Sequence, residues 1–307
     1  MTDNTRSAAR PFDAAPLPEG VALTTSAALY PERHAPGEVG LPLLLVENAL
    51  GRAVIALQGA HAIAFRPAGR REMLWLSPKC KLQPGTAIRG GIPLCLPWFG
   101  PGPDGKSAHG FVRTAVWTLS NAEIAESGET SVTLELAGDA SSNALWPHAF
   151  VFRLEFVVGG SLTMRLSASN LSREAAPFAF AFHTYFAVPD VAQARVSGLE
   201  NTDYIDKMDG GSRQRQHDPV TISGATDRIY LDVPAVQVIE SADGRIAIES
   251  DAGCAVVWNA WDNDRNIADM GAGNHVGYLC VERGEVAERS QTIPPGETYR
   301  SWMTLSL

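Results

Sequence analysis

Short apolar runs separated by turn-forming residues recur along most of this chain, and they restrict its fold more than any other feature. The runs are LPLLLVEN, RAVIALQ, SVTLELAG, FVFRLEFVV, SLTMRLSAS, APFAFAFHTYF, CAVVWNAW, VGYLCVE and YRSWMTLSL. Runs of this length predict β-strands, and no segment has a sustained apolar stripe with a helical period. The longest helical option is a turn or two near residues 121–127. Strands without intervening helices favour an antiparallel sandwich over a parallel α/β fold.

The clearest local prediction is a hairpin within residues 150–168. Apolar and polar residues alternate from Phe150 to Phe156 and again from Leu162 to Leu166, on either side of Gly159-Gly160. Period-two patterning on both sides of a Gly-Gly pair is typical of two antiparallel strands joined by a tight turn.

Length and composition are compatible with one large domain. The chain has 307 residues, and β-sandwiches of about this size can form around one continuous core. Apolar residues make up 45% and charged residues 19%, which is enough to bury a core and is unlike a disordered chain. Residues 1–18 mix Pro, Ala and polar residues without periodicity, so we expect a flexible tail there and a single domain over residues 19–307.

The charge distribution bears on the kind of partner. The formal net charge is −9, and the basic residues are dispersed. A nucleic-acid-binding protein concentrates Lys and Arg on one surface, so we expect no nucleic-acid partner. A small anion can still bind where arginines converge, because local geometry outweighs net charge at contact distance. We expect a small-molecule ligand and a monomer or weak dimer.

Cysteine spacing and hydropathy predict a cytoplasmic protein. Cys80, Cys95, Cys254 and Cys280 form no CxxC pair, which argues against a zinc site and against a dense disulfide framework. No apolar stretch is long enough to span a bilayer, and the N-terminus lacks the apolar region of a signal peptide. We therefore expect reduced thiols and no metal, cofactor or membrane contact.

Two segments combine an arginine with a loop. RGGIPLCLPWFG at residues 89–100 has prolines that prevent regular strand pairing and glycines that would let the backbone approach a ligand beside Arg89. HGFVR places His109 close to Arg113 after a Gly- and Pro-rich loop. Two arginines flanking one loop are suited to clamp a phosphate or carboxylate. Taken separately, each segment has a simpler interpretation: a tight turn with Arg89 in a surface ion pair, and a structural His109.

Two predicted strands carry a histidine and a glutamate. Alternation within residues 176–186 places three phenylalanines on one face and His183, Tyr185 and small residues on the other. Small residues beside a histidine fit a face that borders a cavity, although His183 facing solvent is an equally good interpretation. In GYLCVERG, Glu282 shares a strand face with Tyr278 and Cys280. A solvated Glu282, or one paired with Arg283, is the simpler alternative.

Together these motifs resemble the glucose-6-phosphate 1-epimerases, a branch of the aldose 1-epimerase (galactose mutarotase-like) superfamily. The resemblance is carried by RGGIPLCLPWFG at 89–100, HGFVR at 109–113, WPHAF at 146–150, FHTYF at 182–186, TDRIY at 226–230, VVWNAW at 256–261 and CVERG at 280–284. Any one motif would be weak, whereas the ordered set is specific. The resemblance implies an all-β fold, a large antiparallel β-supersandwich with the sugar site on one concave face.

The resemblance also implies roles for individual residues. His183 corresponds to the catalytic histidine of the family, and Glu282 corresponds to the catalytic glutamate. Arg89 and Arg113 match the positions that hold the sugar phosphate, and Asp227 matches a substrate-contacting aspartate.

The match also leaves one residue without a role and contains two departures. His109, which begins HGFVR, is expected to lie in the site. Val112 stands where relatives commonly have alanine, and Arg283 stands where they commonly have proline after the catalytic glutamate. The second change bears on how rigidly Glu282 is held.

The implied activity is that of an isomerase that interconverts the α and β anomers of glucose 6-phosphate and related hexose 6-phosphates. The C1 hydroxyl must lose a proton and the ring oxygen must gain one. A glutamate with an ordinary pKa of about 4.3 is ionised at neutral pH, and a histidine with a pKa of about 6.5 can supply a proton. We therefore predict Glu282 as the base and His183 as the acid, with the roles reversed on ring closure.

Two alternatives remain open. An aldose 1-epimerase acting on free galactose or glucose would use the same His183 and Glu282 but would not need an arginine clamp. A non-catalytic carbohydrate-binding β-sandwich would use the two side chains only to hydrogen-bond a sugar, and fold-level analogy does not separate these functions.

Overall fold

The computed structural model describes residues 16–307, in which β-strands predominate. The strand pairs of this part of the chain are antiparallel, and the isolated bridge between Leu96 and Gly110 is parallel. The predicted antiparallel, all-β fold is therefore confirmed. Most of the tail expected over residues 1–18 lies outside the described residues. Across residues 16–307, no helix is both long and apolar enough to cross a membrane.

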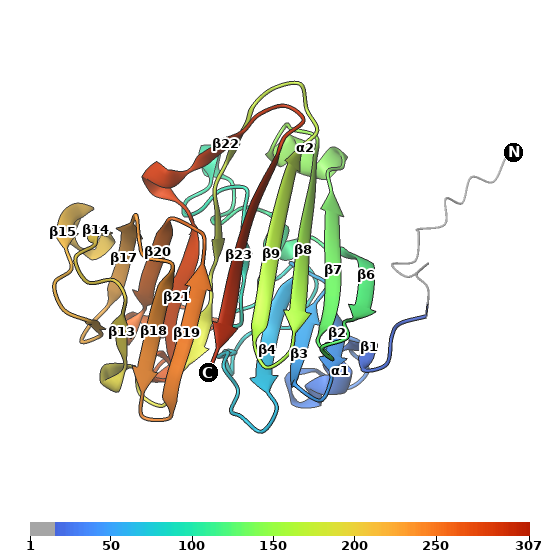
Figure 1. Ribbon diagram of the computed structural model, residues 1–307, viewed down its shortest axis with the longest axis horizontal. Coiled ribbons are helices and arrows are strands. Elements are labelled where there is room, and N and C mark those ends of the chain that lie inside the picture. Colours follow the sequence, from blue (N-terminus) through green and yellow to red (C-terminus); the bar gives the residue numbers. More distant parts are fainter. Residues whose placement is uncertain (1–15) are drawn as a thin grey trace, which may run out of the picture.

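The largest sheet has nine strands, and its long central members lie side by side in Figure 1. In spatial order the strands are β16 (Val220–Thr221), β13 (Arg195–Ser197), β18 (Val236–Ser241), β19 (Gly244–Ser250), β23 (Thr298–Ser306), β9 (Leu162–Asn170), β8 (Phe150–Val158), β7 (Thr130–Ala137) and β6 (Thr118–Ile124). The strands β8 and β9 are joined at Gly159-Gly160 and pair from Phe150–Asn170 to Val158–Leu162, which confirms the predicted hairpin.

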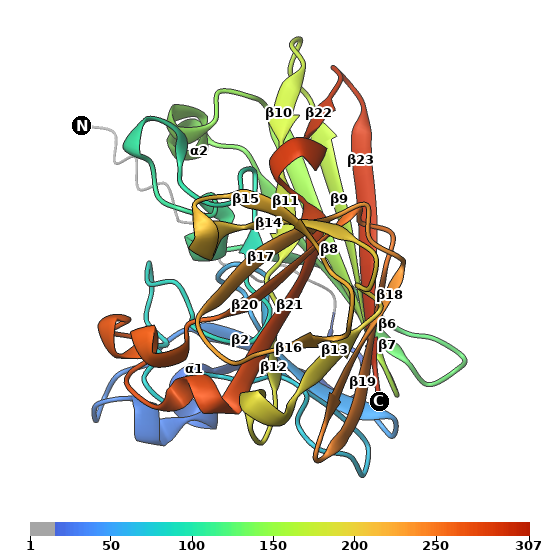
Figure 2. The ribbon, with the colours of Figure 1, turned by 90° about the vertical axis from the view of Figure 1, so that its left-hand side faces the viewer.

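An eight-stranded sheet carries the residues of most interest for function, and Figure 2 shows its strands β17, β20 and β21 running alongside one another. In order, it contains β15 (Ser212–Arg215), β14 (Asp203–Asp206), β17 (Thr226–Leu231), β20 (Cys254–Asn259), β21 (Tyr278–Glu285), β11 (Phe180–Phe182) and β5 (Leu94–Cys95), with β12 (Tyr185–Ala187) also paired to β21.

Two smaller sheets and a few short helices complete the described chain. One sheet contains β1 (Val21–Thr25), β2 (Pro42–Glu47), β3 (Gly51–Ala56) and β4 (His61–Pro67), and the other contains β10 (Ala176–Phe178) and β22 (Gln291–Ile293). The α-helices are α1 (Ser26–Leu29) and α2 (Ala140–Leu145). The 3₁₀ turns are η1 (Pro31–Arg33), η2 (Pro103–Gly105), η3 (Val112–Thr114), η4 (Val191–Gln193), η5 (Lys207–Asp209), η6 (Trp261–Asn266), η7 (Asn274–Gly277) and η8 (Ala287–Arg289).

Side-chain alternation divides the eight-stranded sheet into a core face and a second face. Leu279 and Val281 of β21 join Phe180 and Phe182 of β11 in the main apolar core, which also contains the inward residues of β8 and β9. The alternate residues of β21, Cys280 and Glu282, project to the opposite face. That second face holds the candidate site.

Two local predictions are wrong. The longest helical option, a turn or two near residues 121–127, instead contains the end of β6, an edge strand that pairs with β7, and then a turn. Pairing along the sheet thus overrides the helical propensity of its Ala and Glu residues. The single strand expected over residues 176–186 is divided into β10, β11 and β12, and β10 pairs with β22 in a separate sheet.

Arg283 lies inside the core and anchors β21. Its side chain is completely buried, and its guanidinium donates to the carbonyls of Cys254, Ala235 and Ala252 and to the side-chain oxygen of Gln237. Burial lowers the pKa of Arg283 to about 10. The arginine therefore ties β21 to β20, to the start of β18 and to the segment that follows β19. These contacts hold the strand without the proline of the family pattern.

Candidate active site

His183 and Glu282 come together on the second face of the eight-stranded sheet. Phe182 lies opposite Arg283 in the antiparallel pair of β11 and β21, so the next residue of one strand and the previous residue of the other are neighbours. His183 Nε2 is 3.4 Å from Glu282 Oε1. His183 is 9% exposed and Glu282 is 1% exposed. The simpler interpretations, a solvent-facing histidine and a glutamate paired with Arg283, are therefore wrong.

Each of these two side chains has a buried polar atom without a protein partner. Within residues 16–307, no hydrogen bond is made by His183 Nδ1 or by Glu282 Oε2. Leaving a buried polar atom unpaired costs about 1–3 kcal/mol, and such atoms are uncommon outside functional sites. Their position beside each other favours a polar ligand that binds both.

Burial changes the protonation of the pair. It raises the pKa of Glu282 well above its usual range, and the nearby Asp227 carboxylate adds to this while Lys207 opposes it. Burial also lowers the pKa of His183 well below its usual range, and the nearby His109 and Arg89 lower it further. The assumption of ordinary pKa values is therefore wrong for this site, because each group is biased towards its neutral form.

Aromatic rings surround the histidine. The Tyr185 ring stacks on His183 with a centroid distance of 4.9 Å and an interplanar angle of 4°, and Trp258 meets His183 edge-on at 6.1 Å. Trp75 packs against Tyr185 and Tyr278. Neither tryptophan was singled out from the sequence, although alternation along β20 puts Trp258 on the same face as Val256, the partner of Glu282.

Arg89 reaches the site through Tyr185. Its Nη1 donates to the Tyr185 hydroxyl at 3.0 Å, and its Nε donates to Asp269 Oδ1 at 3.2 Å. The two following glycines have φ of 113° and 62°, and a Cβ at either would collide with the backbone of Trp75 or Ala62. The interpretation that these glycines approach a ligand is therefore wrong, because they approach other backbone segments of the protein.

His109 and Arg113, from the HGFVR segment at residues 109–113, approach His183 from a different part of the chain than Arg89. The His109 ring lies 5.7 Å from the His183 ring and 4.9 Å from Phe99, edge-on in both cases. Arg113 Nη2 donates to the Ala108 carbonyl at 2.8 Å. Both Arg89 and Arg113 are close enough to lower the pKa of His183, so the structure brings both arginines to the surroundings of the histidine.

Asp227 belongs to the same site and is held by a lysine that was not identified from the sequence. Lys207 Nζ donates to Asp227 Oδ2 at 2.7 Å. Both charges act on Glu282, which places the pair next to the catalytic candidates. Lys207 lies in the turn between β14 and β15, where no periodic pattern marks its orientation.

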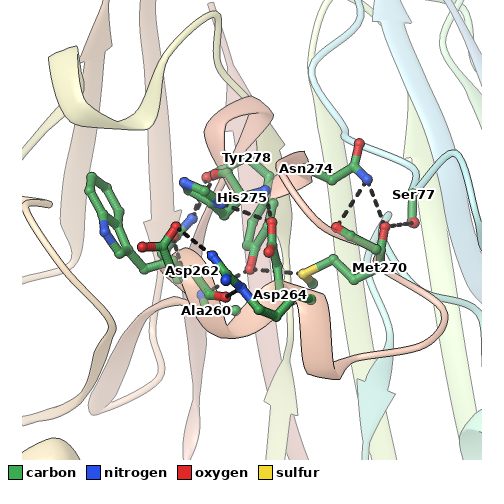
Figure 3. Close-up of polar contacts among 12 residues, drawn as sticks. Ser77, Ala260, Asp262, Asp264, Met270, Asn274, His275 and Tyr278 are labelled. Atoms are coloured by element: carbon green, nitrogen blue, oxygen red, sulfur yellow. Dashed lines mark hydrogen bonds and ion pairs between the residues drawn. The ribbon is translucent and has the colours of Figure 1, made fainter.

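The segment between β20 and β21 is held by side-chain hydrogen bonds and supplies Asp269 to Arg89. Figure 3 shows its central contact, in which the buried Asp264 carboxylate accepts from His275 Nδ1 at 2.8 Å and from the backbone N–H of His275 at 3.0 Å. Ser77 Oγ donates to the Asp269 carbonyl at 2.7 Å. These bonds fix the loop position that orients the arginine.

The four cysteines are free thiols and are buried. Burial raises the pKa of Cys95 and Cys280, and the nearby Glu282 raises it further. Across the described part of the chain, no three His, Cys, Asp or Glu side chains are grouped as metal ligands.

Known proteins similar to this chain belong to the family that its motifs resemble. The profile of the aldose 1-epimerase family matches residues 42–306. A protein of Cenchrus ciliaris, provisionally named glucose-6-phosphate 1-epimerase, is 34% identical over 83% of this chain and 80% of its own length. A protein of Escherichia coli K12 with the same provisional name is 35% identical over 81% of this chain and 84% of its own length.

A solved structure agrees with these relatives. The crystal structure of a Salmonella typhimurium protein, provisionally described as a mutarotase, superposes with a TM-score of 0.81 and is 32% identical, over 87% of this chain and 90% of that protein. The fold and most of the sequence are thus similar to those of a known group of proteins. The chain belongs to the aldose 1-epimerase family.

Proposed function

We propose that this protein is a glucose-6-phosphate 1-epimerase, an isomerase that interconverts the α and β anomers of glucose 6-phosphate and related hexose 6-phosphates. The observation that carries the proposal is the 3.4 Å approach of His183 Nε2 to Glu282 Oε1 in a largely buried site, with a further polar atom of each residue left unpaired among the described residues. Anomer exchange needs one proton acceptor and one proton donor that can touch the same sugar, and this pair supplies both.

The proposed reaction passes one proton in each direction. Glu282 takes the proton of the C1 hydroxyl while His183 gives a proton to the ring oxygen, and the bond between C1 and the ring oxygen breaks. The open-chain aldehyde turns about the C1–C2 bond. His183 then recovers its proton as the ring oxygen attacks the other carbonyl face, and Glu282 returns its proton to O1. Both groups end in their starting state.

The pKa shifts support these roles. A raised pKa makes the ionised Glu282 a stronger base towards a hydroxyl group, and a lowered pKa makes the protonated His183 a stronger acid towards the ring oxygen. In the reactive form Glu282 is ionised and His183 is protonated. This ion pair contains the same number of protons as the neutral pair, so it is reached by moving one proton from Glu282 to His183.

Arg89 and Arg113 support a phosphorylated substrate. In the part of the chain that the structure describes, Arg113 has no carboxylate within 4.0 Å, whereas Arg89 is partly neutralised by Asp269. A sugar phosphate dianion would supply the missing negative charge through charge-assisted hydrogen bonds. An epimerase for free hexoses has no use for this charge.

The test is two-dimensional exchange NMR of anomer interconversion with wild-type protein, using glucose 6-phosphate and glucose as substrates. We expect faster catalysed exchange, measured as kcat/KM, for the phosphorylated sugar. Preferred exchange of free glucose would replace the proposal with an aldose 1-epimerase acting on free hexoses. Saturable sugar binding without catalysed exchange of either substrate would identify a carbohydrate-binding protein instead.

A further inference from the structure

We propose that Lys207 is a positioning residue of the epimerase site, which holds and neutralises Asp227 so that Asp227 and Glu282 can face the same sugar. The inference rests on the proposed function. It concerns a residue that belongs to neither the histidine–glutamate pair nor the two arginines.

The turn that carries Lys207 is anchored to the strand that carries Asp227. Asp206, at the end of β14, accepts from the backbone N–H of Met208 at 2.9 Å and so caps η5. The same carboxylate pairs with Arg228 at 3.4 Å, and Asp206 lies directly opposite Arg228 in the β14–β17 register. The backbone on both sides of the lysine–aspartate contact is therefore fixed.

The contact itself leaves Asp227 able to bind a ligand. Lys207 Nζ bonds Oδ2 at 2.7 Å, and the described residues make no hydrogen bond to Oδ1. The side chain of Asp227 is 20% exposed and that of Lys207 is 41% exposed. A sugar hydroxyl can therefore donate to Oδ1 while the ammonium group keeps the carboxylate in one orientation.

Neutralisation matters because two carboxylates lie close together at this point. Asp227 opposes the ionisation of the fully buried Glu282, and Lys207 favours it. The titratable and charged groups that face Glu282 from the surrounding elements are His183, Asp227, Lys207, Cys95, Cys280 and Tyr185. Lys207 is the cationic side chain of this set, so its loss would leave Glu282 beside the uncompensated negative charge of Asp227.

The experiment compares the pH profile of kcat/KM for glucose 6-phosphate, measured by exchange NMR, in wild-type protein and in Lys207→Met, Lys207→Arg and the double variant Lys207→Met/Asp227→Asn. Loss of a nearby cation raises the pKa of the acid–base pair. We expect both limbs of the Lys207→Met profile to move up by about one pH unit, with about tenfold lower kcat/KM on the acid side. Lys207→Arg should restore the profile, and the double variant should return its position, though not its height, towards wild type.

The control is Arg215→Met, which removes an exposed ion pair with Asp203 in the same hairpin and should leave the profile unchanged. An active wild-type protein whose Lys207→Met profile does not move would overturn this inference alone. A higher KM without any movement of the profile would also overturn it, because Lys207 would then be a phosphate ligand. A wild-type protein without exchange activity would overturn the proposed function and this inference together.

Discussion

At the scale of single residues, burial of ionisable groups determines both chemistry and stability. His61 shows this outside the reacting pair. Its side chain is completely buried, and its Nε2 lies 2.7 Å from the Gly90 carbonyl, which can only accept, so Nε2 carries the hydrogen. Burial lowers the pKa of His61 to about 4. This neutral histidine supports the turn that follows Arg89.

His61 should make the protein less stable in acid. Its folded-state pKa is lower than its unfolded value of 6.5, so the unfolded chain binds more protons and stability falls as the pH decreases below 6.5. At pH 5 the loss from this residue is about 2 kcal/mol relative to pH 7. Urea unfolding at both pH values should show a smaller difference for His61→Gln, which retains a donor but does not titrate. An identical pH dependence in wild type and variant would refute this.

The two arginines should differ in their effect on phosphate binding. Arg113 has no carboxylate partner among the described residues and Arg89 is paired with Asp269, so more of the attraction for a phosphate should come from Arg113. We expect Arg113→Met to raise KM for glucose 6-phosphate at least tenfold and more than Arg89→Met does, with little effect on KM for glucose. Steady-state exchange rates at several substrate concentrations measure this. Equal increases in KM for glucose 6-phosphate and for glucose would show that the two arginines do not bind the phosphate.

At the scale of elements, β21 is the strand on which the site depends. It presents Glu282 on one face and Arg283 on the other, and its neighbours β11 and β12 lead into and out of the segment that contains His183. The alternation of these strands could be predicted from sequence, because one face must match the apolar core. The division of residues 176–186 could not, because it depends on partners such as β22 that lie more than a hundred residues away.

Removing the buried arginine should destabilise this element. Arg283→Met leaves several buried carbonyls and the Gln237 side chain without a donor, and we expect a loss of about 3 kcal/mol in the free energy of unfolding. Guanidinium chloride unfolding measures the change. Arg245→Met removes an exposed pair with Glu240 on the nearby hairpin and should change stability by no more than about 0.5 kcal/mol. Similar effects of the two substitutions would show that Arg283 does not anchor β21.

At the scale of the whole molecule, the sequence predicted the fold class and the meeting of His183 and Glu282, because strand periodicity and ordered motifs can be read directly from the linear sequence. It missed Lys207 and Asp269, since loops carry no periodicity that shows which way a side chain points. It also misjudged the ionisation of the central pair, because desolvation is a property of the assembled sheets. The single domain over residues 19–307 and the monomer or weak dimer stay predictions.

The central claim is that one sugar contacts both His183 and Glu282 and exchanges protons with both. Exchange NMR of glucose 6-phosphate with Glu282→Gln and with His183→Asn tests it most directly, provided that each variant unfolds as cooperatively as wild type. We predict that each substitution lowers kcat by about 10² or more, the usual contribution of a positioned proton-transfer group. A folded variant of either kind that exchanges anomers at close to the wild-type rate would contradict the account.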